Sequence, residues 1–388
     1  MTMASWDDAR EAARRRLPKI FFDYIDGAAF SEETAAANIA DFAQWKLNQR
    51  VLTGVATRDH STTYLGVKRP LPFMLGPVGF SGLFAPHGEI LAARAAHAAG
   101  VPFCLSNFGI TSLEELRAAT SGPLWFQLYV MRDRALAEVF IARAEKVGVE
   151  ALCVTVDTSV GGVRDRDTRN GFRSLKHMTP RLALQLMTRP RWCWVIGRTG
   201  PVRIKNLDGQ TKYGSGVLEQ ASRIAGEIDP GMNWDDLARI RGRWKGKLVV
   251  KGILNAEDAS RCAAIGADAL VVSNHGGRQL DCSPSTISVL PDIVAASGAK
   301  LDVLFDGGIR RGTQIVKALA LGAKGVLLGR AYAYALAAGG ESGVAQMIRL
   351  LTTEIDVTIG HVGVPEVLRL HAMRAEILRR AGEPPMRW

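Results

Sequence analysis

Short apolar runs alternate with helical patterns through most of this chain. The runs are rich in Val, Leu and Phe and occupy residues 73–78, 102–105, 124–128, 151–156, 247–250, 269–272, 303–305 and 326–328. Strands that are apolar on both faces and alternate with helices are typical of a parallel sheet covered by helices. Eight such units predict an α/β fold, a closed (β/α)8 TIM barrel over residues 70–330.

Helix start signals lie between these runs. Ser112 is followed three residues later by Glu115, the pattern of a capping box, and Asn255 precedes the helical pattern of residues 256–265. A Ser or Asn side chain at such a position accepts a hydrogen bond from a backbone N–H of the first turn. We therefore expect helices to begin after Ser112 and after Asn255.

The spacing of the strand ends has one irregularity. Successive ends are 21 to 31 residues apart, except that 94 residues separate Asp157, after the fourth run, from Lys251, after the fifth. This gap predicts an insertion over about residues 169–232 in a βα loop. Such loops form the active-site face of a barrel.

The segments outside the barrel read as helical. A helical pattern at residues 15–30 predicts an N-terminal helical extension, and residues 331–388 predict a C-terminal helical tail. No second domain, internal repeat or low-complexity tract is evident. We therefore expect residues 1–388 to form a single domain.

Polar side chains recur where the predicted strands end. Any one of them has a simple explanation, such as a loop-facing residue or a helix cap. A barrel, however, places the carboxyl ends of its strands around one pocket. We therefore expect a shared site for Ser106, Gln127, Tyr129, Thr155, Asp157, Lys251, Ser273, His275, Arg278, Asp306 and Arg310.

The segment SNHGGRQLD, residues 273–281, is the sharpest signal. It holds His275 and Arg278 on either side of two glycines, which let the backbone turn tightly and approach a ligand closely. A general base and a guanidinium that binds a carboxylate could share this loop. The alternative is a structural loop whose histidine has ordinary hydrogen-bond partners.

Glycine-rich turns follow the seventh and eighth predicted strands. They read FDGGIRRG, residues 305–312, and LLGRA, residues 327–331, and they match the usual phosphate site of a barrel. Arg310 and Arg330 would add charge-assisted contacts. The chain has no GxGxxG after its first strand and no P-loop, which argues against a Rossmann site. It also lacks HxxxH, HExxH and clustered carboxylates, so we expect no metal site.

The composition excludes several classes of protein. Hydrophobic residues form 47% of the 388 residues, which is too many for a disordered chain. Five dispersed cysteines do not form the framework of a secreted disulfide-rich domain. The first twenty residues include Asp7, Asp8 and Glu11 and lack the apolar run of a signal peptide. We therefore expect a cytoplasmic protein.

The positive charge is local. Residues 169–212 hold ten basic side chains and one acidic one, so they carry most of the formal net charge of +11. Leu182, Trp192 and Trp194 are interleaved with these cations, a pattern that suits a helix lying in an anionic membrane interface. A solvated loop whose tryptophans pack on the barrel is the alternative. No nucleic-acid-binding motif accompanies the charge, so we expect no nucleic acid partner.

Several motifs occur in the order found in one family. They are WFQLYV at 125–130, VTVD at 154–157, VVKGI at 249–253, and the three segments given above. Through them the chain resembles the FMN-dependent L-2-hydroxy acid oxidases and dehydrogenases, from about Tyr24 to the C-terminal tail. The resemblance implies oxidation of an L-2-hydroxy acid to a 2-keto acid on bound FMN.

The resemblance also implies a role for each candidate residue. His275 would be the base, Asp157 would stabilise its imidazolium form, and Tyr129 would contact the substrate hydroxyl. Arg164, Arg278 and Tyr24 would bind the substrate carboxylate. FMN would be held by Pro77, Val78, Gly79, Ser106, Gln127, Thr155, Lys251, Ser273, Asp306, Gly307, Gly308, Arg310, Gly329 and Arg330.

Departures from relatives point to a subgroup. Phe108 stands where glycolate oxidases have tryptophan, Gly161 is small where several relatives are bulky, and Gly79 is typical of the dehydrogenases. Together with the basic insertion, these residues favour a dehydrogenase of the lactate or mandelate type. It would pass electrons to quinone or another membrane acceptor, at the inner face of the cell membrane. The resemblance also implies a homotetramer, the common assembly in the family.

Three alternatives stay open at this point. One is an oxidase that reduces O2 to H2O2. Barrel flavoenzymes of other classes share the phosphate turns but would lack the set formed by Tyr129, Arg164, His275 and Arg278. A non-catalytic basic binding protein on a barrel scaffold is the most remote of the three.

Overall fold

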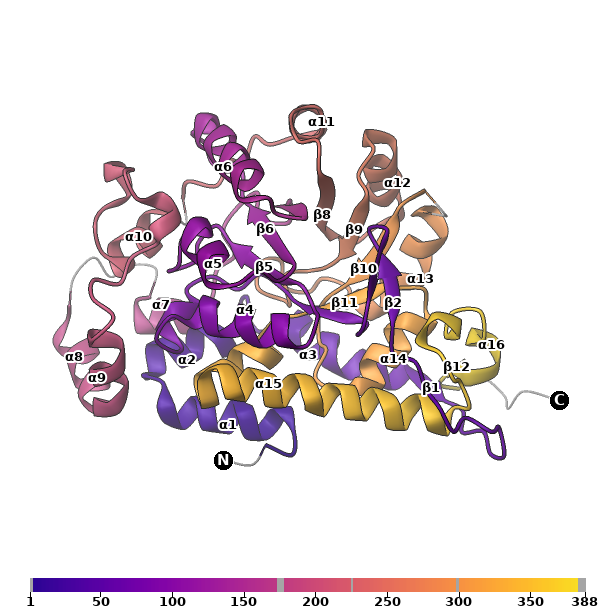
Figure 1. Cartoon of the computed structure of the whole chain (residues 1–388). Coiled ribbons are helices and arrows are strands. Elements are labelled where there is room, and N and C mark those ends of the chain that lie inside the picture. Colours follow the sequence, from indigo (N-terminus) through magenta and orange to yellow (C-terminus); the bar gives the residue numbers. More distant parts are fainter. Residues whose placement is uncertain (1–2, 173–177, 225, 298–299, 383–388) are drawn as a thin grey trace.

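The computed structural model describes residues 3–172, 178–224, 226–297 and 300–382 (Figure 1). Eight parallel strands form a closed barrel in chain order, and the last strand pairs with the first. The strands are β4 (Phe73–Leu75), β5 (Phe103–Ser106), β6 (Leu124–Leu128), β7 (Ala151–Thr155), β8 (Lys247–Ile253), β9 (Ala269–Val272), β10 (Asp302–Phe305) and β11 (Gly325–Leu328). The predicted barrel is confirmed.

The observed strand boundaries differ most from the predicted ones at the first strand and at the fifth, where β8 continues to Ile253. The apolar run reaches Val78, but β4 ends at Leu75, before Gly76 and Pro77. Proline has no backbone N–H to donate to a neighbouring strand, so the ladder ends where Pro77 begins the loop. The shortened strand places residues 77–79 in a loop above the barrel.

Helices cover the outside of the barrel, as their start signals predict. They are α4 (Gly88–Ala98), α5 (Leu113–Ala119), α6 (Arg134–Val147), α11 (Trp234–Arg243), α12 (Ala256–Ile265), α13 (Thr286–Ser297), α14 (Gly312–Ala320) and α15 (Arg330–His361). The Ser112 hydroxyl accepts from the Glu115 N–H at 3.2 Å, and the Asn255 side chain accepts from the Asp258 N–H at 2.8 Å. Both predicted caps are present.

The N-terminal extension is helical but interrupted. It forms α1 (Trp6–Arg16), α2 (Lys19–Asp26) and α3 (Glu33–Ala40). The predicted helical extension is confirmed, but its pattern at 15–30 is divided, because Pro18 begins a new helix and Gly27 is extended. The break turns α2 so that its C-terminal end faces the barrel.

Among the described residues, four short strands have no counterpart in the sequence prediction. β2 (Thr62–Tyr64) and β3 (Val67–Arg69) form a hairpin, and Tyr64 packs edge-on against Trp125 in the barrel interior, 6.1 Å between ring centroids. β1 (Trp45–Leu47) pairs with β12 (Leu378–Arg380) and so joins the N-terminal extension to the C-terminal tail. The tail that follows α15 also contains α16 (Arg374–Ile377).

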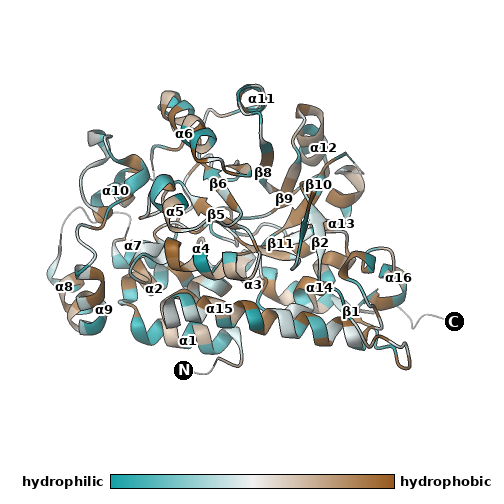
Figure 2. Cartoon of the chain, in the orientation of Figure 1, coloured by the Kyte–Doolittle hydropathy of each residue, from teal (hydrophilic) through white to brown (hydrophobic). Residues whose placement is uncertain are grey.

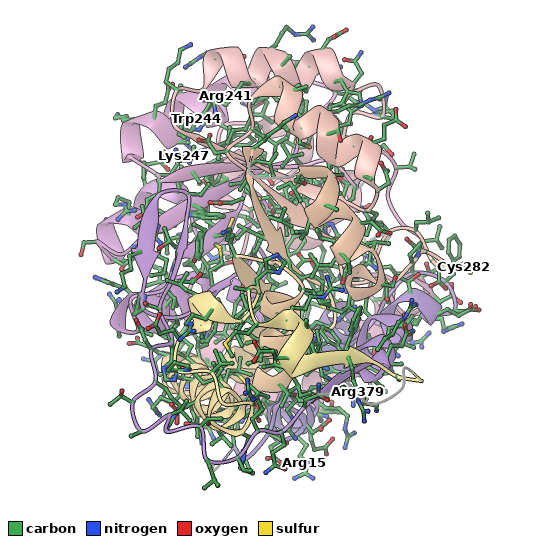
Figure 3. The ribbon with its side chains drawn as sticks, turned by 90° about the vertical axis from the view of Figure 1, so that its right-hand side faces the viewer. Arg15, Arg241, Trp244, Lys247, Cys282 and Arg379 are labelled. Atoms are coloured by element: carbon green, nitrogen blue, oxygen red, sulfur yellow. The ribbon has the colours of Figure 1, made fainter. Side chains whose placement is uncertain are left out.

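In its described residues, the insertion after β7 forms four short α-helices and two 3-10 turns. The α-helices are α7 (Asp165–Asn170), α8 (Pro180–Met187), α9 (Pro190–Gly197) and α10 (Val217–Ile224), and α8 and α9 lie at one edge of the molecule (Figure 1). The chain re-enters the barrel through a turn where Arg241 donates to the carbonyl oxygen of Gly246 at 2.9 Å and Trp244 Nε1 to that of Lys247 at 2.8 Å. Figure 3 shows Arg241, Trp244 and Lys247 gathered at the opposite end of the molecule from Arg15.

Among the described residues, no helix combines the length and the apolar character needed to cross a bilayer.

Candidate active site

A pocket opens at the carboxyl ends of the barrel strands. It encloses about 1370 Å³ between its lining atoms, open mouth included. Most of the expected site residues line it, namely Tyr24, Pro77, Val78, Gly79, Ser106, Gln127, Tyr129, Arg164, Lys251, His275, Arg278, Asp306, Gly307, Gly308, Arg310, Gly329 and Arg330. Thr155, Asp157 and Ser273 lie behind this lining and contact it through hydrogen bonds.

Strand register brings the polar side chains together. Ser106 on β5 lies opposite Gln127 on β6, and Thr155 on β7 lies opposite Lys251 on β8. Gln127 Nε2 donates to the Thr155 hydroxyl at 2.8 Å. Because parallel strands end at one edge, these pairs form a continuous polar rim.

His275 lies between an acid and a phenol. Its Nδ1 is 2.8 Å from Asp157 Oδ1, and its Nε2 is 3.3 Å from the Tyr129 hydroxyl. Burial lowers the pKa of His275, although Asp157 opposes that effect. The imidazole is therefore neutral at neutral pH, with Nδ1–H donating to Asp157 and the Nε2 lone pair facing the pocket, as a general base requires.

Asp157 remains ionised in this setting. Burial alone would raise the pKa of Asp157, but His275 and Lys251 hold it below its usual range. Its Oδ2 has no hydrogen-bond partner among the described residues. A negative charge next to Nδ1 would stabilise His275 after it takes up a proton.

The turn that carries His275 is strained. His275, Gly276 and Gly277 have φ values of 57°, 66° and 75°. A Cβ at Gly277 would meet the backbone of Ala35 at 2.6 Å, so only glycine fits there. The Ser273 hydroxyl accepts from the His275 N–H at 3.0 Å and fixes the start of the turn. Such strain is typical of functional sites.

Two arginines make the pocket strongly positive. The Arg278 guanidinium lies over the Tyr24 ring at 4.9 Å and donates to the Gly27 carbonyl oxygen at 2.7 Å. Burial and the nearby Arg164 lower the pKa of Arg278 to about 9, so the group keeps its charge at neutral pH. Arg164 is 3.3 Å from Asp167, which balances one of the two charges. A substrate carboxylate would balance the other.

Lys251 supplies a third buried cation. Its Nζ lies 2.9 Å from Asp306 Oδ2 and 2.9 Å from the Ser273 hydroxyl. Burial would lower the pKa of Lys251, but Asp306 and Asp157 outweigh it and raise the pKa above its usual value. A fixed positive charge here would stabilise electron density that develops in a ring bound beside it.

The far end of the pocket suits a phosphate. Gly307 and Gly308 have φ values of 104° and 82°, and a Cβ at Gly308 would clash with the Asn38 carbonyl oxygen at 1.9 Å. A Cβ at Gly329, which precedes α15, would meet nothing within 4 Å, so the helix N-terminus is open to a ligand. Arg310 is buried, and its Nε has no partner among the described residues.

These features fit flavin mononucleotide. The glycine turns and Arg310 suit its phosphate, and Asp306, whose Oδ1 is buried and unpartnered in the described part of the chain, suits its ribityl hydroxyls. The rim formed by Ser106, Gln127 and Thr155 suits the polar edge of its ring. A buried polar atom without a hydrogen-bond partner destabilises the fold unless a ligand contacts it. These atoms therefore indicate a ligand-binding site.

Sequence reasoning missed the roof of the pocket. Phe172, Ala221, Ile224 and Ile228 come from the insertion and line the pocket. Phe172 packs against Tyr24 at 4.7 Å between ring centroids. No motif marks these residues, because their position depends on how the insertion folds back.

The surface of α8 and α9 lies in the basic segment for which the sequence favours a membrane interface. We define it by the exposed residues Leu184, Met187 and Trp194 and the cations Arg181, Arg189, Arg191 and Arg198. The apolar side chains are 64%, 74% and 65% exposed, and Figure 2 shows hydrophobic residues on these outlying helices. Trp192 instead packs inward, with its Nε1 donating to the Leu83 carbonyl oxygen at 2.8 Å. The two tryptophans therefore have opposite environments.

Part of the basic charge of residues 169–212 is neutralised by ion pairs. Arg169, Arg203, Lys205 and Lys212 form ion pairs with Asp165, Asp208, Glu115 and Asp133. Within the described ranges, the four cations of the α8–α9 surface have no carboxylate ion pair. Arg173 and Lys176 lie outside the described residues.

The chain is similar to known proteins along nearly its whole length. The family described as FMN-dependent dehydrogenase matches residues 13–377. An L-lactate dehydrogenase of Caulobacter vibrioides is 48% identical over 98% of this chain and 100% of its own, and one of Pseudomonas syringae pv. syringae is 43% identical over 96% and 98%.

Solved structures agree in fold. A monotopic membrane protein, (S)-mandelate dehydrogenase, superimposes with a TM-score of 0.92 and 39% identity over 98% of this chain and 100% of its own. A mandelate oxidase superimposes with a TM-score of 0.85 and 36% identity over 97% and 99%. Dehydrogenases and an oxidase thus share this fold.

Proposed function

Because the chain belongs to the FMN-dependent dehydrogenase family and is an FMN-dependent dehydrogenase of L-2-hydroxy acids, we propose that it oxidises L-lactate to pyruvate and delivers the electrons to a membrane quinone. One observation carries the proposed chemistry. The neutral His275, held by Asp157, faces the same pocket as the cations Arg278 and Arg164.

The chain's own residues bind, orient and deprotonate the substrate in this proposal. Arg278 and Arg164 bind its carboxylate, and Tyr129 and Tyr24 contact its carboxylate and hydroxyl oxygens. His275 Nε2 takes one proton, either from the hydroxyl or from Cα, and Asp157 stabilises the resulting charge.

Bound FMN supplies the acceptor for the two electrons that leave the substrate. Gly307, Gly308, Arg310, Gly329 and Arg330 would hold its phosphate, and Asp306 and Lys251 its ribityl chain. Pro77, Val78, Gly79, Ser106, Gln127 and Thr155 would contact its ring, and Ser273 would orient Lys251.

L-Lactate is favoured because two relatives that match nearly end to end are L-lactate dehydrogenases. (S)-Mandelate is the second candidate, because Gly161 leaves space in a pocket that Phe108, Ala221 and Ile224 line with apolar surface. Anaerobic mixing with each acid distinguishes them. We expect flavin bleaching by (S)-lactate and not by (R)-lactate. Faster bleaching by (S)-mandelate would make it the substrate, and inertness toward both would reject the proposal.

The quinone acceptor is supported by Gly79. The dehydrogenases that the chain resembles have glycine at this position, whereas the oxidases typically have alanine. A Cβ there would lie in ordinary van der Waals contact, 3.4 Å from the Tyr24 hydroxyl and 3.6 Å from Phe108 Cβ. Stopped-flow reoxidation tests the acceptor. We expect the reduced protein to react faster with a ubiquinone analogue than with O2. The reverse order would make the protein an oxidase that forms H2O2.

The α8–α9 surface supports attachment to an anionic membrane. Exposed Leu184, Met187 and Trp194 can enter the interface, while each flanking cation gains about 1 kcal/mol near anionic lipid. This would place the protein peripherally at the inner face of the cell membrane. A homotetramer is the assembly we propose, and sedimentation velocity of the detergent-free protein measures it.

Vesicle flotation tests the attachment. We expect the triple variant L184S/M187S/W194S to lose binding to anionic vesicles and to stay yellow. Its matched control is V51S/L52S, which removes the 72% exposed Val51 and the fully exposed Leu52 from the loop after β1, on the opposite side of the molecule from α8 and α9 (Figure 1). Equal flotation of the triple variant and the control would refute the attachment, as would unchanged partitioning after deletion of Arg173–Lys205.

A further inference from the structure

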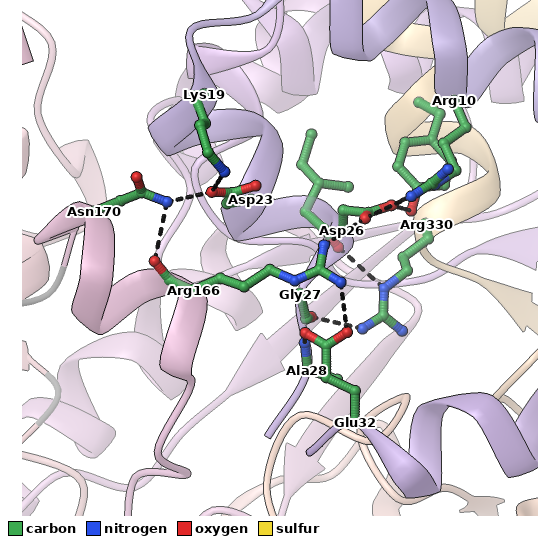
Figure 4. A network of polar contacts seen from close by, with 12 residues as sticks. Arg10, Lys19, Asp23, Asp26, Gly27, Ala28, Glu32, Arg166, Asn170 and Arg330 are labelled. Carbon is green, nitrogen blue, oxygen red and sulfur yellow. Dashed lines mark hydrogen bonds and ion pairs between the residues drawn. The ribbon is translucent and has the colours of Figure 1, made fainter. Parts of the chain in front are cut away.

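The C-terminal end of α2 lies in a dense charged network (Figure 4). Asp26 Oδ1 accepts from Arg10 Nε at 2.6 Å and from the Tyr334 hydroxyl at 2.7 Å. Asp26 Oδ2 accepts from Arg10 Nη2 at 2.8 Å and from Arg166 Nη1 at 2.7 Å. One carboxylate thus joins α1, α2, the α7 helix of the insertion and α15.

This carboxylate is buried and ionised. Its side chain is 5% exposed. Burial would raise the pKa of Asp26, but Arg10, Tyr334 and Arg166 hold it at about 2. Charge-assisted hydrogen bonds of this kind are stronger than neutral ones and hold their partners in fixed directions.

The residue after Asp26 contacts both ends of the pocket. The Gly27 carbonyl oxygen accepts from Arg278 Nη1 at 2.7 Å and from Arg330 Nη2 at 2.8 Å. Arg330 also donates to the carbonyl oxygens of Ile25 at 3.0 Å and Gly276 at 2.7 Å. A single peptide therefore orients the arginine at the substrate end and the arginine at the phosphate end.

Arg278 depends on this contact. In the described part of the chain it forms no carboxylate ion pair, and the Gly27 carbonyl and the Tyr24 ring, 4.9 Å away, are its close partners. Tyr24 and Gly27 both belong to the segment that Asp26 anchors. A shift of this segment would move both supports of Arg278 together.

We propose that Asp26 is a positioning residue that sets the binding of substrate and of FMN at once, because it fixes the Gly27 carbonyl between Arg278 and Arg330. The proposal rests on the proposed function in assigning Arg278 to the substrate carboxylate and Arg330 to the FMN phosphate. Asp26 touches neither ligand, so its effect passes through these two guanidiniums.

The same helix supplies a matched control. Asp23 lies one turn earlier, is 4% exposed, and contacts Lys19 and Asn170 (Figure 4). Like Asp26, it joins α2 to the insertion through buried polar contacts. Unlike Asp26, it lies four positions before Gly27 instead of next to it, and its side chain contacts neither α1 nor α15 among the described residues. Asp23→Asn therefore also removes a buried carboxylate charge from α2, but it should leave the Gly27 carbonyl in place.

The experiment compares the holoenzymes of D26N and D23N with the parent. We measure KM and kcat for L-lactate, binding of oxalate from the flavin absorbance, and FMN release on dilution from the fluorescence of free flavin. For D26N we expect KM and the oxalate Kd to rise about tenfold, FMN release to increase, and kcat to change less than about threefold. D23N should change only the melting temperature.

Tyr334→Phe covers the case in which D26N does not fold. It removes one of the hydrogen bonds to Asp26, and we expect the same pattern with increases of about twofold to threefold. The proposal is overturned if D23N and D26N behave alike, or if only one of the two ligands binds more weakly. Failure of L-lactate as a substrate would not affect the oxalate and FMN measurements, so the two proposals are tested separately.

Discussion

At the scale of single residues, the balance between burial and neighbouring charges decides which groups of the site are ionised. His275 stays neutral because burial lowers its pKa, and Lys251 stays charged because Asp306 and Asp157 outweigh burial. Burial dominates at the histidine and neighbouring carboxylates dominate at the lysine, so the two groups have opposite protonation states within one pocket. This is the arrangement that separates a base from an electrostatic stabiliser.

Replacing His275 with Ala should leave the protein folded and yellow but should slow flavin reduction by about 10²-fold to 10⁴-fold, the usual contribution of a positioned base. Single-turnover anaerobic mixing with L-lactate measures the rate, and the melting temperature controls for folding. Undiminished reduction would remove His275 from the mechanism.

Replacing Asp157 with Asn should change the pH profile. Asp157 raises the pKa of His275 against the effect of burial, so its loss should lower that pKa further. The acidic limb of kcat/KM, where His275 becomes protonated, lies below pH 6.5 in the parent and should move to lower pH in the variant. The maximum rate should fall, because the imidazolium loses its counter-charge. A limb that moves to higher pH would contradict this assignment.

At the scale of elements, a buried carboxylate on α4 joins two loops of the pocket. Glu89 accepts from the N–H groups of Gly82 at 3.1 Å and Ile110 at 2.9 Å, and from the Thr111 hydroxyl at 3.0 Å. These residues flank the loops that contain Gly79 and Phe108. The helix therefore fixes the loops after β4 and β5 relative to each other.

Replacing Glu89 with Ala should destabilise the protein strongly, because each buried donor left without a partner costs about 1–3 kcal/mol. Urea unfolding measures the loss, which should appear as a lower midpoint with an unchanged slope. The control is Glu115→Ala, since Glu115 is exposed in its capping box and should cost about 1 kcal/mol or less. Equal losses for the two variants would contradict the role of Glu89.

At the scale of the whole molecule, positive charge and apolar surface coincide on α8 and α9. Other cations of the insertion, such as Lys212 and Lys205, are neutralised by Asp133 and Glu115 at the barrel helices. The four cations of the α8–α9 surface, which form no ion pair in the described part of the chain, should therefore carry the electrostatic part of membrane binding.

Replacing Arg181, Arg189, Arg191 and Arg198 with Gln should weaken binding to anionic vesicles and should remove most of its dependence on salt. Ion screening weakens exposed charges beyond about 10 Å at 0.1 M salt, so the parent should bind less as salt rises. Flotation across a salt series measures how steeply vesicle binding falls with salt for the parent and for the variant. Identical slopes would assign the binding to the apolar side chains alone.

The sequence predicts the barrel and the gathering of the expected polar side chains around one pocket, for a physical reason. The strands are apolar on both faces and lie at regular spacing, and parallel strands bring their carboxyl ends to one edge. The hairpin of β2 and β3 could not be predicted, because three-residue strands carry no periodic pattern. Nor could the opposite environments of Trp192 and Trp194, since packing of α9 against the barrel decides which indole is buried.

The shared Gly27 carbonyl has a consequence for biosynthesis. Arg330 donates to a carbonyl oxygen that lies 303 residues earlier in the chain, and β11 closes the barrel against β4. Neither contact can form until almost the whole barrel has left the ribosome. Contacts between residues so distant in sequence form late, so a nascent or truncated chain would present neither the phosphate end nor the substrate end in working order. We therefore expect FMN to bind only to chains that have been synthesised through β11 and α15.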